Sequence, residues 1–129
     1  MAAKAQHEYA VYLFRQGYYG DAVTQLDEAL REEETGERWS DWATAQFALS
    51  HFPEAERGFR RALVLDPELS DAAVSFGAML MSLSRWKEAI EMFEGVLSKL
   101  QPEPRASVSA LAEQCREQLE MAAQISAGG

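Results

Sequence analysis

Histidine and cysteine are the side chains in this sequence best suited to metal binding or nucleophilic catalysis. The chain contains two histidines, His7 and His51, and one cysteine, Cys115. None of them has a second His or Cys at the two- to five-residue step that is common in zinc sites. Cys115 falls on the apolar stripe of its segment, where a thiol acts as a small buried hydrophobe. We therefore predict no metal site, no cofactor and no catalytic residue.

Phosphate loops and paired carboxylates are also missing from the sequence. No glycine-rich motif of the kind that cradles phosphates occurs. The acidic residues are spread over helical segments and do not face one another as an acid–base pair. The sequence therefore predicts that this chain is not itself an enzyme.

A run of three glutamates, Glu32 to Glu34, is the densest charge cluster. It stands at the expected end of a helix, where negative charge opposes the helix dipole. One interpretation is a solvated helix end. The other is a patch for a basic partner.

The overall charge is strongly negative and excludes several partner classes. Twelve Lys and Arg stand against 21 Asp and Glu, a net charge of −9, which repels nucleic acid and anionic membranes. No apolar run approaches the roughly 20 residues that a bilayer requires, so we expect no membrane insertion. The N-terminus lacks a signal-peptide pattern, and one cysteine cannot form an internal disulfide. We expect a cytoplasmic location.

Three segments of the chain repeat one pattern. Each contains an alanine, and successive alanines lie 33 and 34 residues apart. An aromatic residue stands three positions before each alanine, a large apolar residue four after it, and a small residue twelve before it. In the order small, aromatic, alanine, large, these are Ala10, Tyr19, Ala22, Leu26; Ala43, Phe52, Ala55, Phe59; and Gly77, Trp86, Ala89, Phe93.

Each repeat predicts two antiparallel helices joined by a tight turn, because apolar residues recur at helical spacing on both sides of a break. Helices whose axes come within about 8–10 Å need small side chains at the contact. We expect the three alanines to be buried at those crossings. Ser40-Asp41 and Ser70-Asp71 are expected to cap helix starts, and Pro102 and Pro104 to end the third repeat.

On these residues the chain resembles the tetratricopeptide repeat family. The period of about 34 residues, the small–large–small order and a late proline, Pro67, are typical of that family. Trp39 stands where the family often has tryptophan, and Gly17 precedes the first turn. The resemblance covers roughly residues 3–103 and is strongest over 38–67. The departures from the pattern are Gln6, Glu34, Gln46, Ala73 and Val96.

The resemblance implies an all-α fold, a right-handed α-solenoid of three helix-turn-helix repeats plus a C-terminal capping helix. We expect a single domain over residues 1–129, with repeats at about 3–35, 36–69 and 70–103 and the cap at 104–126. It also implies a protein-interaction module or scaffold. The partner stays open, because the residues that carry the resemblance are packing residues.

The segment 104–126 has a fourth apolar stripe, which consists of Val108, Leu111, Cys115, Leu119 and Ala122. Stacked repeats leave the last apolar face uncovered, so a half-polar helix is needed to cover it. An alternative is that this helix detaches or pairs with another copy, which would make the chain a homo-oligomer.

In such a stack the first helix of each pair lines the concave face. Residues of these helices that lie outside the packing stripe are therefore the predicted partner-binding residues. They are Lys4, His7, Val11, Phe14, Arg15, Glu37, Ser40, Thr44, Phe47, Asp71, Val74, Ala78 and Met81. The groove is more apolar than a solvated face, which indicates that it binds a protein or peptide segment, with Phe14, Phe47 and Met81 as anchors. Alternatively, the cap helix or a neighbouring copy fills it.

The resemblance allows one binding mode to be tested. Some tetratricopeptide domains hold acidic C-terminal tails of chaperones in a clamp of lysine, asparagine and arginine side chains. The matching places here hold His7, Val11, Asp41, Asp71 and Ser75, none of which fits, so the sequence excludes the clamp. Other functions stay open: a self-assembling scaffold, a small chaperone of a secretion system, or a regulatory fragment of a larger enzyme.

Overall fold

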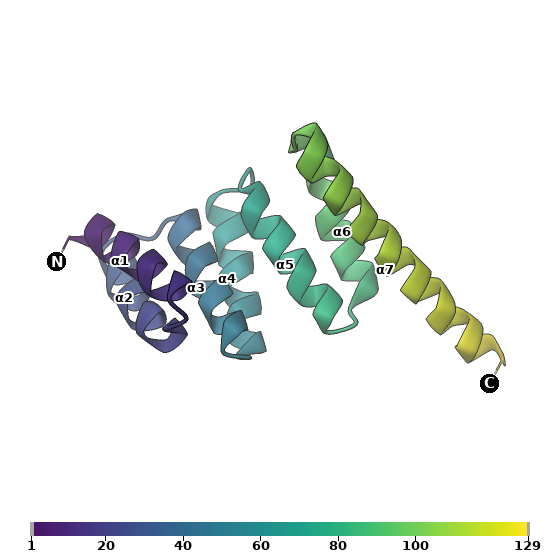
Figure 1. Ribbon diagram of the computed structural model, residues 1–129, viewed down its shortest axis with the longest axis horizontal. Coiled ribbons are helices and arrows are strands. Elements are labelled where there is room, and N and C mark those ends of the chain that lie inside the picture. Colours follow the sequence, from purple (N-terminus) through teal and green to yellow (C-terminus); the bar gives the residue numbers. More distant parts are fainter. Residues whose placement is uncertain (1, 129) are drawn as a thin grey trace. The chain divides into compact units, whose positions relative to one another are not determined.

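The fold is all-α, as predicted. A computed structural model describes residues 2–128, which contain helices and turns but no β-strand. The elements are α1 (Ala3–Arg15), α2 (Tyr19–Glu32), α3 (Gly36–Ala48), α4 (Phe52–Leu65), α5 (Ser70–Ser82), α6 (Trp86–Val96), the 3-10 turn η1 (Leu97–Lys99) and α7 (Pro102–Gly128) (Figure 1). Among these residues no helix is both long and apolar enough to cross a membrane.

The chain divides into two compact units, one up to Ala72 and one from Ala73 onward. The first holds α1 to α4 and the first turn of α5. The second holds the rest of α5, α6, η1 and α7. Each expected repeat contains one helix pair, and the expectation that the whole chain forms a single domain stays a prediction.

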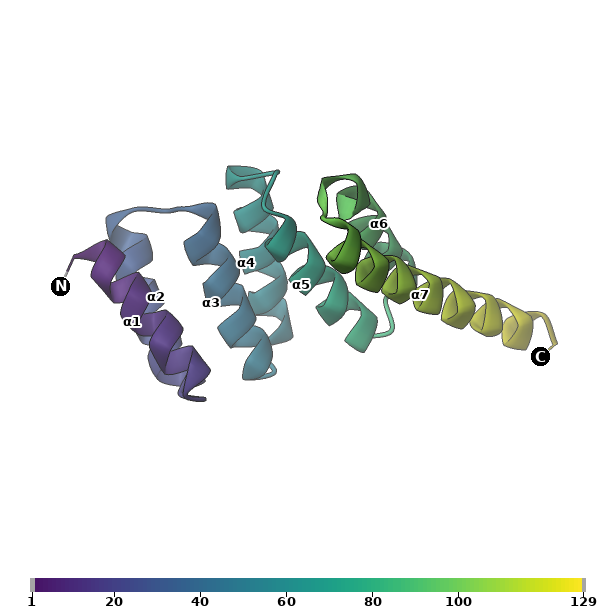
Figure 2. The same cartoon turned by 45° about the horizontal axis from the view of Figure 1, so that its top comes forward.

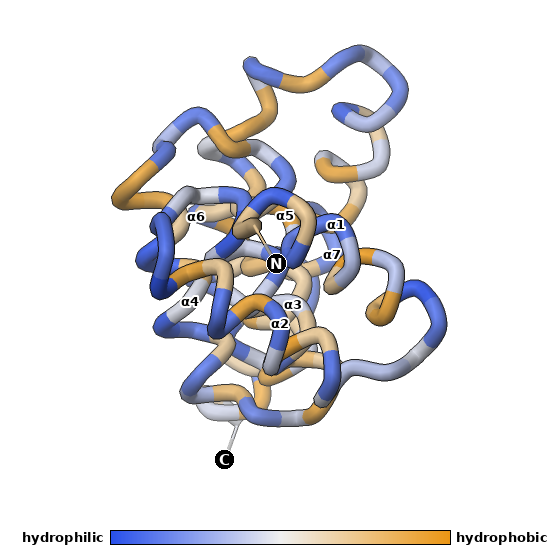
Figure 3. The backbone as a smooth tube through the Cα atoms, turned by 90° about the vertical axis from the view of Figure 1, so that its left-hand side faces the viewer, coloured by the Kyte–Doolittle hydropathy of each residue, from blue (hydrophilic) through white to orange (hydrophobic). Residues whose placement is uncertain are grey.

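Helices of the first unit pack in sequence order. α1 packs on α2, α2 on α3 and α3 on α4, and Figure 2 shows the four lying side by side. Apolar and polar stretches alternate along these helices (Figure 3). This periodicity lets each helix turn one face inward and leave the other in water.

Small residues lie at the helix crossings, as the repeat pattern predicted. Ala22, Ala55 and Ala89 have no exposed surface, and Ala10 and Ala43 have none either. At Gly58 on α4 a Cβ atom would lie 2.8 Å from the Cβ of Ala43 on α3, and at Gly77 it would lie 2.5 Å from Cε1 of Phe93. The helices therefore approach too closely for any larger side chain.

The turns inside the three pairs have the same geometry. Gly17, Ser50 and Ser84 all have positive φ, of 88°, 62° and 59°, and stand 33 and 34 residues apart. The amide after each one donates to the carbonyl five residues before it, as in Tyr18 to Leu13 at 2.9 Å. This closes the helix end in the left-handed manner that glycine favours. The two serines adopt it without glycine's freedom, at a conformational cost.

The start of α3 differs from the expectation. The helix begins at Gly36, and the hydroxyl of Thr35 accepts a hydrogen bond from the Arg38 amide at 3.1 Å. Ser40 and Asp41 therefore lie inside the helix, and the prediction that they cap its start is wrong. Thr35 is the N-cap residue because its extended backbone places its hydroxyl over the free amides of the first turn.

The acidic run after α2 is largely neutralised within the chain. Glu33 accepts from Arg38 at 3.4 Å, and Glu34 accepts from Trp39 Nε1 at 2.8 Å and from Arg61 Nε at 3.3 Å. These bonds tie the segment between α2 and α3 to both helices of the second pair. Glu33 and Glu34 are thus engaged within the chain, whereas Glu32, the last residue of α2, is exposed.

Two of the departures from the family pattern are polar residues at buried sites. Gln46 is only 7% exposed, and its Oε1 lies 2.7 Å from Nδ1 of His51. Gln6, also 7% exposed, donates to the carboxylate of Glu28 on α2. A buried polar side chain is tolerated where it has a partner, which explains why both glutamines fit.

The second unit ends differently from the expectation. α6 stops at Val96, η1 follows, and Pro102 is the first residue of α7, so the prolines start the last helix and do not end the third repeat. Proline suits a first helical turn because the amide it lacks has no partner there. Arg105 also donates to the Leu97 and Leu100 carbonyls at 3.0 and 2.7 Å, which joins α7 to η1.

The capping helix is covered only over its first half. α7 packs on α6, and Val108, Ala112 and Cys115 are buried. Leu119 is 39% exposed, and Ala122 is exposed as well, so the predicted stripe is wrong beyond Cys115. The reason is length: α6 ends, and α7 runs on past it (Figure 1).

We predict that Gly58→Ala destabilises the protein, because Trp42 and Ala43 leave no room for a methyl group. The expected loss is about 1–3 kcal/mol of unfolding free energy, measured by urea denaturation. Gly95→Ala is the matched control, since nothing lies within 4 Å of its added Cβ, and it should be neutral or stabilising by up to about 1 kcal/mol. Equal effects at the two sites would contradict the close helix approach.

We also predict a pH-dependent contribution of Glu34. Hydrogen bonds from Arg61 and then Trp39 lower the pKa of Glu34 below 4.5. The stabilisation is therefore present above pH 4.5 and is lost as the pH falls through the lower folded pKa. Glu34→Gln should therefore lower the melting temperature at pH 7. In acid, where Glu34 of the natural sequence is protonated, the two proteins should have similar melting temperatures. Glu32→Gln, from the same run, should change little at either pH.

Candidate functional site

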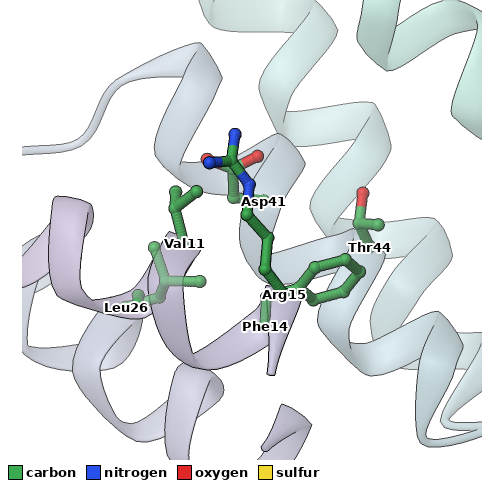
Figure 4. Close-up of a pocket in the computed structure, with 7 residues that line it drawn as sticks. Val11, Phe14, Arg15, Leu26, Asp41 and Thr44 are labelled. Atoms are coloured by element: carbon green, nitrogen blue, oxygen red, sulfur yellow. The ribbon is translucent and has the colours of Figure 1, made fainter. Parts of the chain in front are cut away.

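An apolar pocket lies between the first helices of the two pairs in the first unit. It encloses about 150 Å³ and is lined by Ala10, Val11, Phe14, Arg15, Leu26, Asp41 and Thr44. Figure 4 shows α1 supplying Val11, Phe14 and Arg15, while Asp41 and Thr44 come from α3. Only the last two and Arg15 are polar, so the wall is mainly hydrocarbon.

Two more hollows adjoin this pocket. One, of about 540 Å³, is lined by Lys4, His7, Glu8, Val11, Asp66 and residues 35–38, and it shares Val11 with the apolar pocket. The other, of about 230 Å³, is lined by Glu37, Ser40, Asp41, Leu69 and Asp71, and it shares Asp41 with the apolar pocket. Because neighbouring hollows share lining residues, we refer to the three together as the α1–α3 groove.

The structure brings together most of the residues predicted from the first two repeats and one, Asp71, from the third. Those that line the α1–α3 groove are Lys4, His7, Val11, Phe14, Arg15, Glu37, Ser40, Thr44 and Asp71. Val74, Ala78 and Met81 belong to the second unit, where Ala78 is exposed and the other two are half-buried. Whether those three join the same site stays a prediction.

The two predicted phenylalanine anchors also have a structural role. Phe14 packs on Tyr19 with ring centroids 5.0 Å apart, and Phe47 packs on Phe52 at 5.9 Å. Each pair joins the end of one helix to the start of the next across a turn. Phe14 lines the apolar pocket in addition, whereas Phe47 lines none of the three hollows. Truncating either ring is therefore expected to lower stability as well.

An interhelical hydrogen bond crosses the α1–α3 groove. His7 Nε2 lies 2.6 Å from Asp41 Oδ2, which connects α1 to α3. The His7 side chain is 18% exposed and that of Asp41 44%. His7 and Asp41, which occupy two of the positions where related domains carry clamp residues, are thus bonded to each other. Neither residue is the lysine or asparagine that could hold an acidic tail, and both side chains are engaged in this contact.

Half of the residues that line the α1–α3 groove were not predicted from the sequence, and Asp41 and Leu26 of the apolar pocket are two of them. The pattern predicts Asp41 at a helix start, but α3 begins five residues earlier, so Asp41 lies one turn after Glu37 and one turn before Thr44. That four- and three-residue spacing is a signal that could have found it. Leu26 is a core residue, 1% exposed, and forms part of the pocket wall.

The histidine and cysteine side chains are buried or engaged with other residues. Cys115 has no exposed surface, and burial raises the pKa of its thiol, which disfavours the reactive thiolate. In residues 2–128 no group of three or more His, Cys, Asp or Glu side chains could hold a metal ion. His7 and His51 are each engaged with one side chain, Asp41 and Gln46.

Comparison with known proteins identifies the fold. No protein-family model and no curated protein matches the sequence. Among solved structures, the Arabidopsis OM64 TPR domain is 23% identical with a TM-score of 0.81, and the match covers 90% of this chain and 95% of that one. The first TPR of Spaghetti (RPAP3) bound to the HSP90 peptide SRMEEVD is 22% identical, with a TM-score of 0.84 and coverage of 92% and 93%.

A third structure, the TPR2B domain of yeast Sti1 in complex with pHsp70, is 19% identical with a TM-score of 0.82 and coverage of 90% and 97%. The chain therefore has the tetratricopeptide repeat fold. The resemblance inferred from its repeats is confirmed at the level of the fold.

The buried position of Cys115 generates a test. We expect the thiol in the native protein to react with iodoacetamide at least about tenfold more slowly than in the urea-unfolded chain at the same pH, because access requires local opening of α7 from α6. The measurement is the modified fraction by mass spectrometry over time. Equal rates in the two states would show that Cys115 is exposed.

Proposed function

We propose that this chain is a protein-interaction module that binds a short peptide segment of another protein in the α1–α3 groove. The observation that carries the proposal is the apolar pocket beside Val11 and Thr44. A cavity of about 150 Å³ lined by apolar side chains is large enough for a benzene-sized group. One large apolar side chain of a partner fits that description.

Polar groups around the pocket would orient the bound segment. Arg15 and Asp41 stand in its wall as two charges of opposite sign. Binding sites with an apolar wall and a few placed polar groups gain affinity from burial and direction from hydrogen bonds. Burial contributes about 25 cal/mol per Å² of apolar surface before the cost of ordering the peptide is subtracted.

The comparisons support the class of function without specifying the ligand. The Spaghetti domain is bound to a peptide of HSP90, and the Sti1 domain is in complex with pHsp70. The same fold here supports a peptide or protein partner. The His7–Asp41 contact argues against the acidic-tail clamp as the way in which this chain would hold one.

The proposal is tested with a phage-displayed library of random 12-residue peptides selected against the full chain. A synthetic peptide of the enriched sequence should shift the amide NMR signals of Val11, Phe14 and Thr44. Val11→Lys should weaken its binding at least about tenfold, because a charged side chain then occupies the apolar pocket. The affinity is measured by fluorescence anisotropy.

Val64→Lys is the matched control. Val64 is 69% exposed on α4 and lines none of the three hollows. The Val64→Lys variant should bind the peptide as tightly as the natural sequence does and have a similar melting temperature. Failure to select any peptide, or equal binding by Val11→Lys, would overturn the proposal.

A further inference from the structure

One hollow of the α1–α3 groove has an acidic lining. Glu37 in the first turn of α3, Asp41 one turn later and Asp71 in the first turn of α5 line the 230 Å³ hollow together with Ser40 and Leu69. No basic residue is part of that lining. Within residues 2–128, neither Glu37 nor Asp71 forms an ion pair, and the Asp41 carboxylate pairs only with His7.

The hydroxyl of Ser40 is a second, independent feature of the hollow, an unpaired polar group on an otherwise buried residue. Ser40 is 8% exposed and lines the same hollow. Its backbone carbonyl accepts from Thr44 at 2.8 Å, but its side chain makes no hydrogen bond to the described residues. No fully enclosed side-chain oxygen or nitrogen among the described residues lacks a partner, so this hydroxyl faces the open space of the hollow, where an entering donor can bond to it.

A compact metal ion does not fit this lining. The three carboxylates are not grouped closely enough to hold one ion in residues 2–128. An extended cation, such as a guanidinium or an ammonium on a flexible stem, can reach more than one separated acceptor. The chemistry of the hollow therefore favours a lysine or arginine side chain.

The basic groups nearby do not already fill this role. Arg15 lines the apolar pocket with Asp41, but among the described residues it forms no ion pair with Asp41. Arg38 donates to the carbonyl of Glu33 at 2.8 Å, which directs it away toward the α2–α3 segment. Lys4 lines the adjoining large hollow with Glu37, but it forms no ion pair within the described part of the chain. Unneutralised carboxylates in a recess attract a cation more strongly than those on an open surface.

We propose that the bound segment carries a lysine or arginine that enters the Glu37–Asp41–Asp71 hollow, next to an apolar residue that enters the Val11–Thr44 pocket. This inference rests on the proposed function. Because the two hollows share Asp41, the two side chains must stand only a few residues apart in the partner. The partner motif is basic and apolar, opposite in charge to SRMEEVD, the HSP90 peptide in the Spaghetti complex.

The test uses the enriched library peptide described above and a version in which each Lys or Arg is replaced by Gln. The enriched peptides should contain Lys or Arg near a large apolar residue. Their replacement by Gln should weaken binding about tenfold at low salt, and by less at high salt. The double variant Glu37→Gln/Asp71→Asn should bind the basic peptide more weakly, to a similar extent. Its affinity for the Gln version of the peptide should equal that of the natural sequence.

A matched control separates the hollow from the overall charge. Glu117→Gln/Glu120→Gln removes the same two charges from exposed positions of α7 and should leave binding of the basic peptide unchanged. An equal loss in this control would mean that net charge alone attracts the peptide, which overturns the inference. Melting curves of both double variants confirm that they are folded.

The two proposals fail in different ways. Peptides that require Val11 but show no preference for Lys or Arg would overturn the basic motif and leave the groove intact. The basic motif is likewise overturned if Glu37→Gln/Asp71→Asn has no effect. If no peptide is enriched, or if Val11→Lys binds as well as the natural sequence, the groove itself is wrong. Preferential binding of SRMEEVD would also contradict the basic motif.

Discussion

The close approach of paired helices is the constraint on which the rest of the structure depends. Ala22 and Ala55 have no exposed surface, and the space at Gly58 is too small for one added methyl group. Interhelical distances near 8–10 Å are possible only because these side chains are small. The large apolar residues one turn further along, such as Phe59, then fill the space where the helices diverge. This division between small and large positions repeats with the period of the sequence.

That constraint also separates packing residues from binding residues. Helix α1 turns Ala10 and Leu13 toward the core, so Val11 and Phe14 are left beside α3. Two first helices held side by side in this way create a recess that neither would form alone. The fold thus supplies a shaped surface, and within residues 2–128 no group of three or more His, Cys, Asp or Glu side chains could hold a metal ion.

The places where the repeats deviate are compensated locally. Gln46 replaces a leucine and bonds to His51, while Glu34 replaces a proline and joins Arg61 to Trp39. Ser50 and Ser84 hold the left-handed turn that Gly17 adopts freely. The two acidic regions differ: Glu33 and Glu34 form ion pairs, whereas Glu37 and Asp71 form none with the residues that the structure describes. A repeat fold can absorb such changes because each contact involves only neighbouring helices.

The amino-acid sequence by itself determined the helix pairs, their turns, the buried alanines and about half of the residues that line the α1–α3 groove. These features follow from local periodicity, which occurs three times in the sequence. Only the tertiary structure decided that Asp41 bonds to His7 and Glu34 to Arg61. It also decided that α7 packs against α6 over only half its length. The first two contacts join residues 34 and 27 positions apart, and the third depends on where a helix ends. Side-chain spacing along one helix carries no information about which partner a neighbouring helix places opposite it.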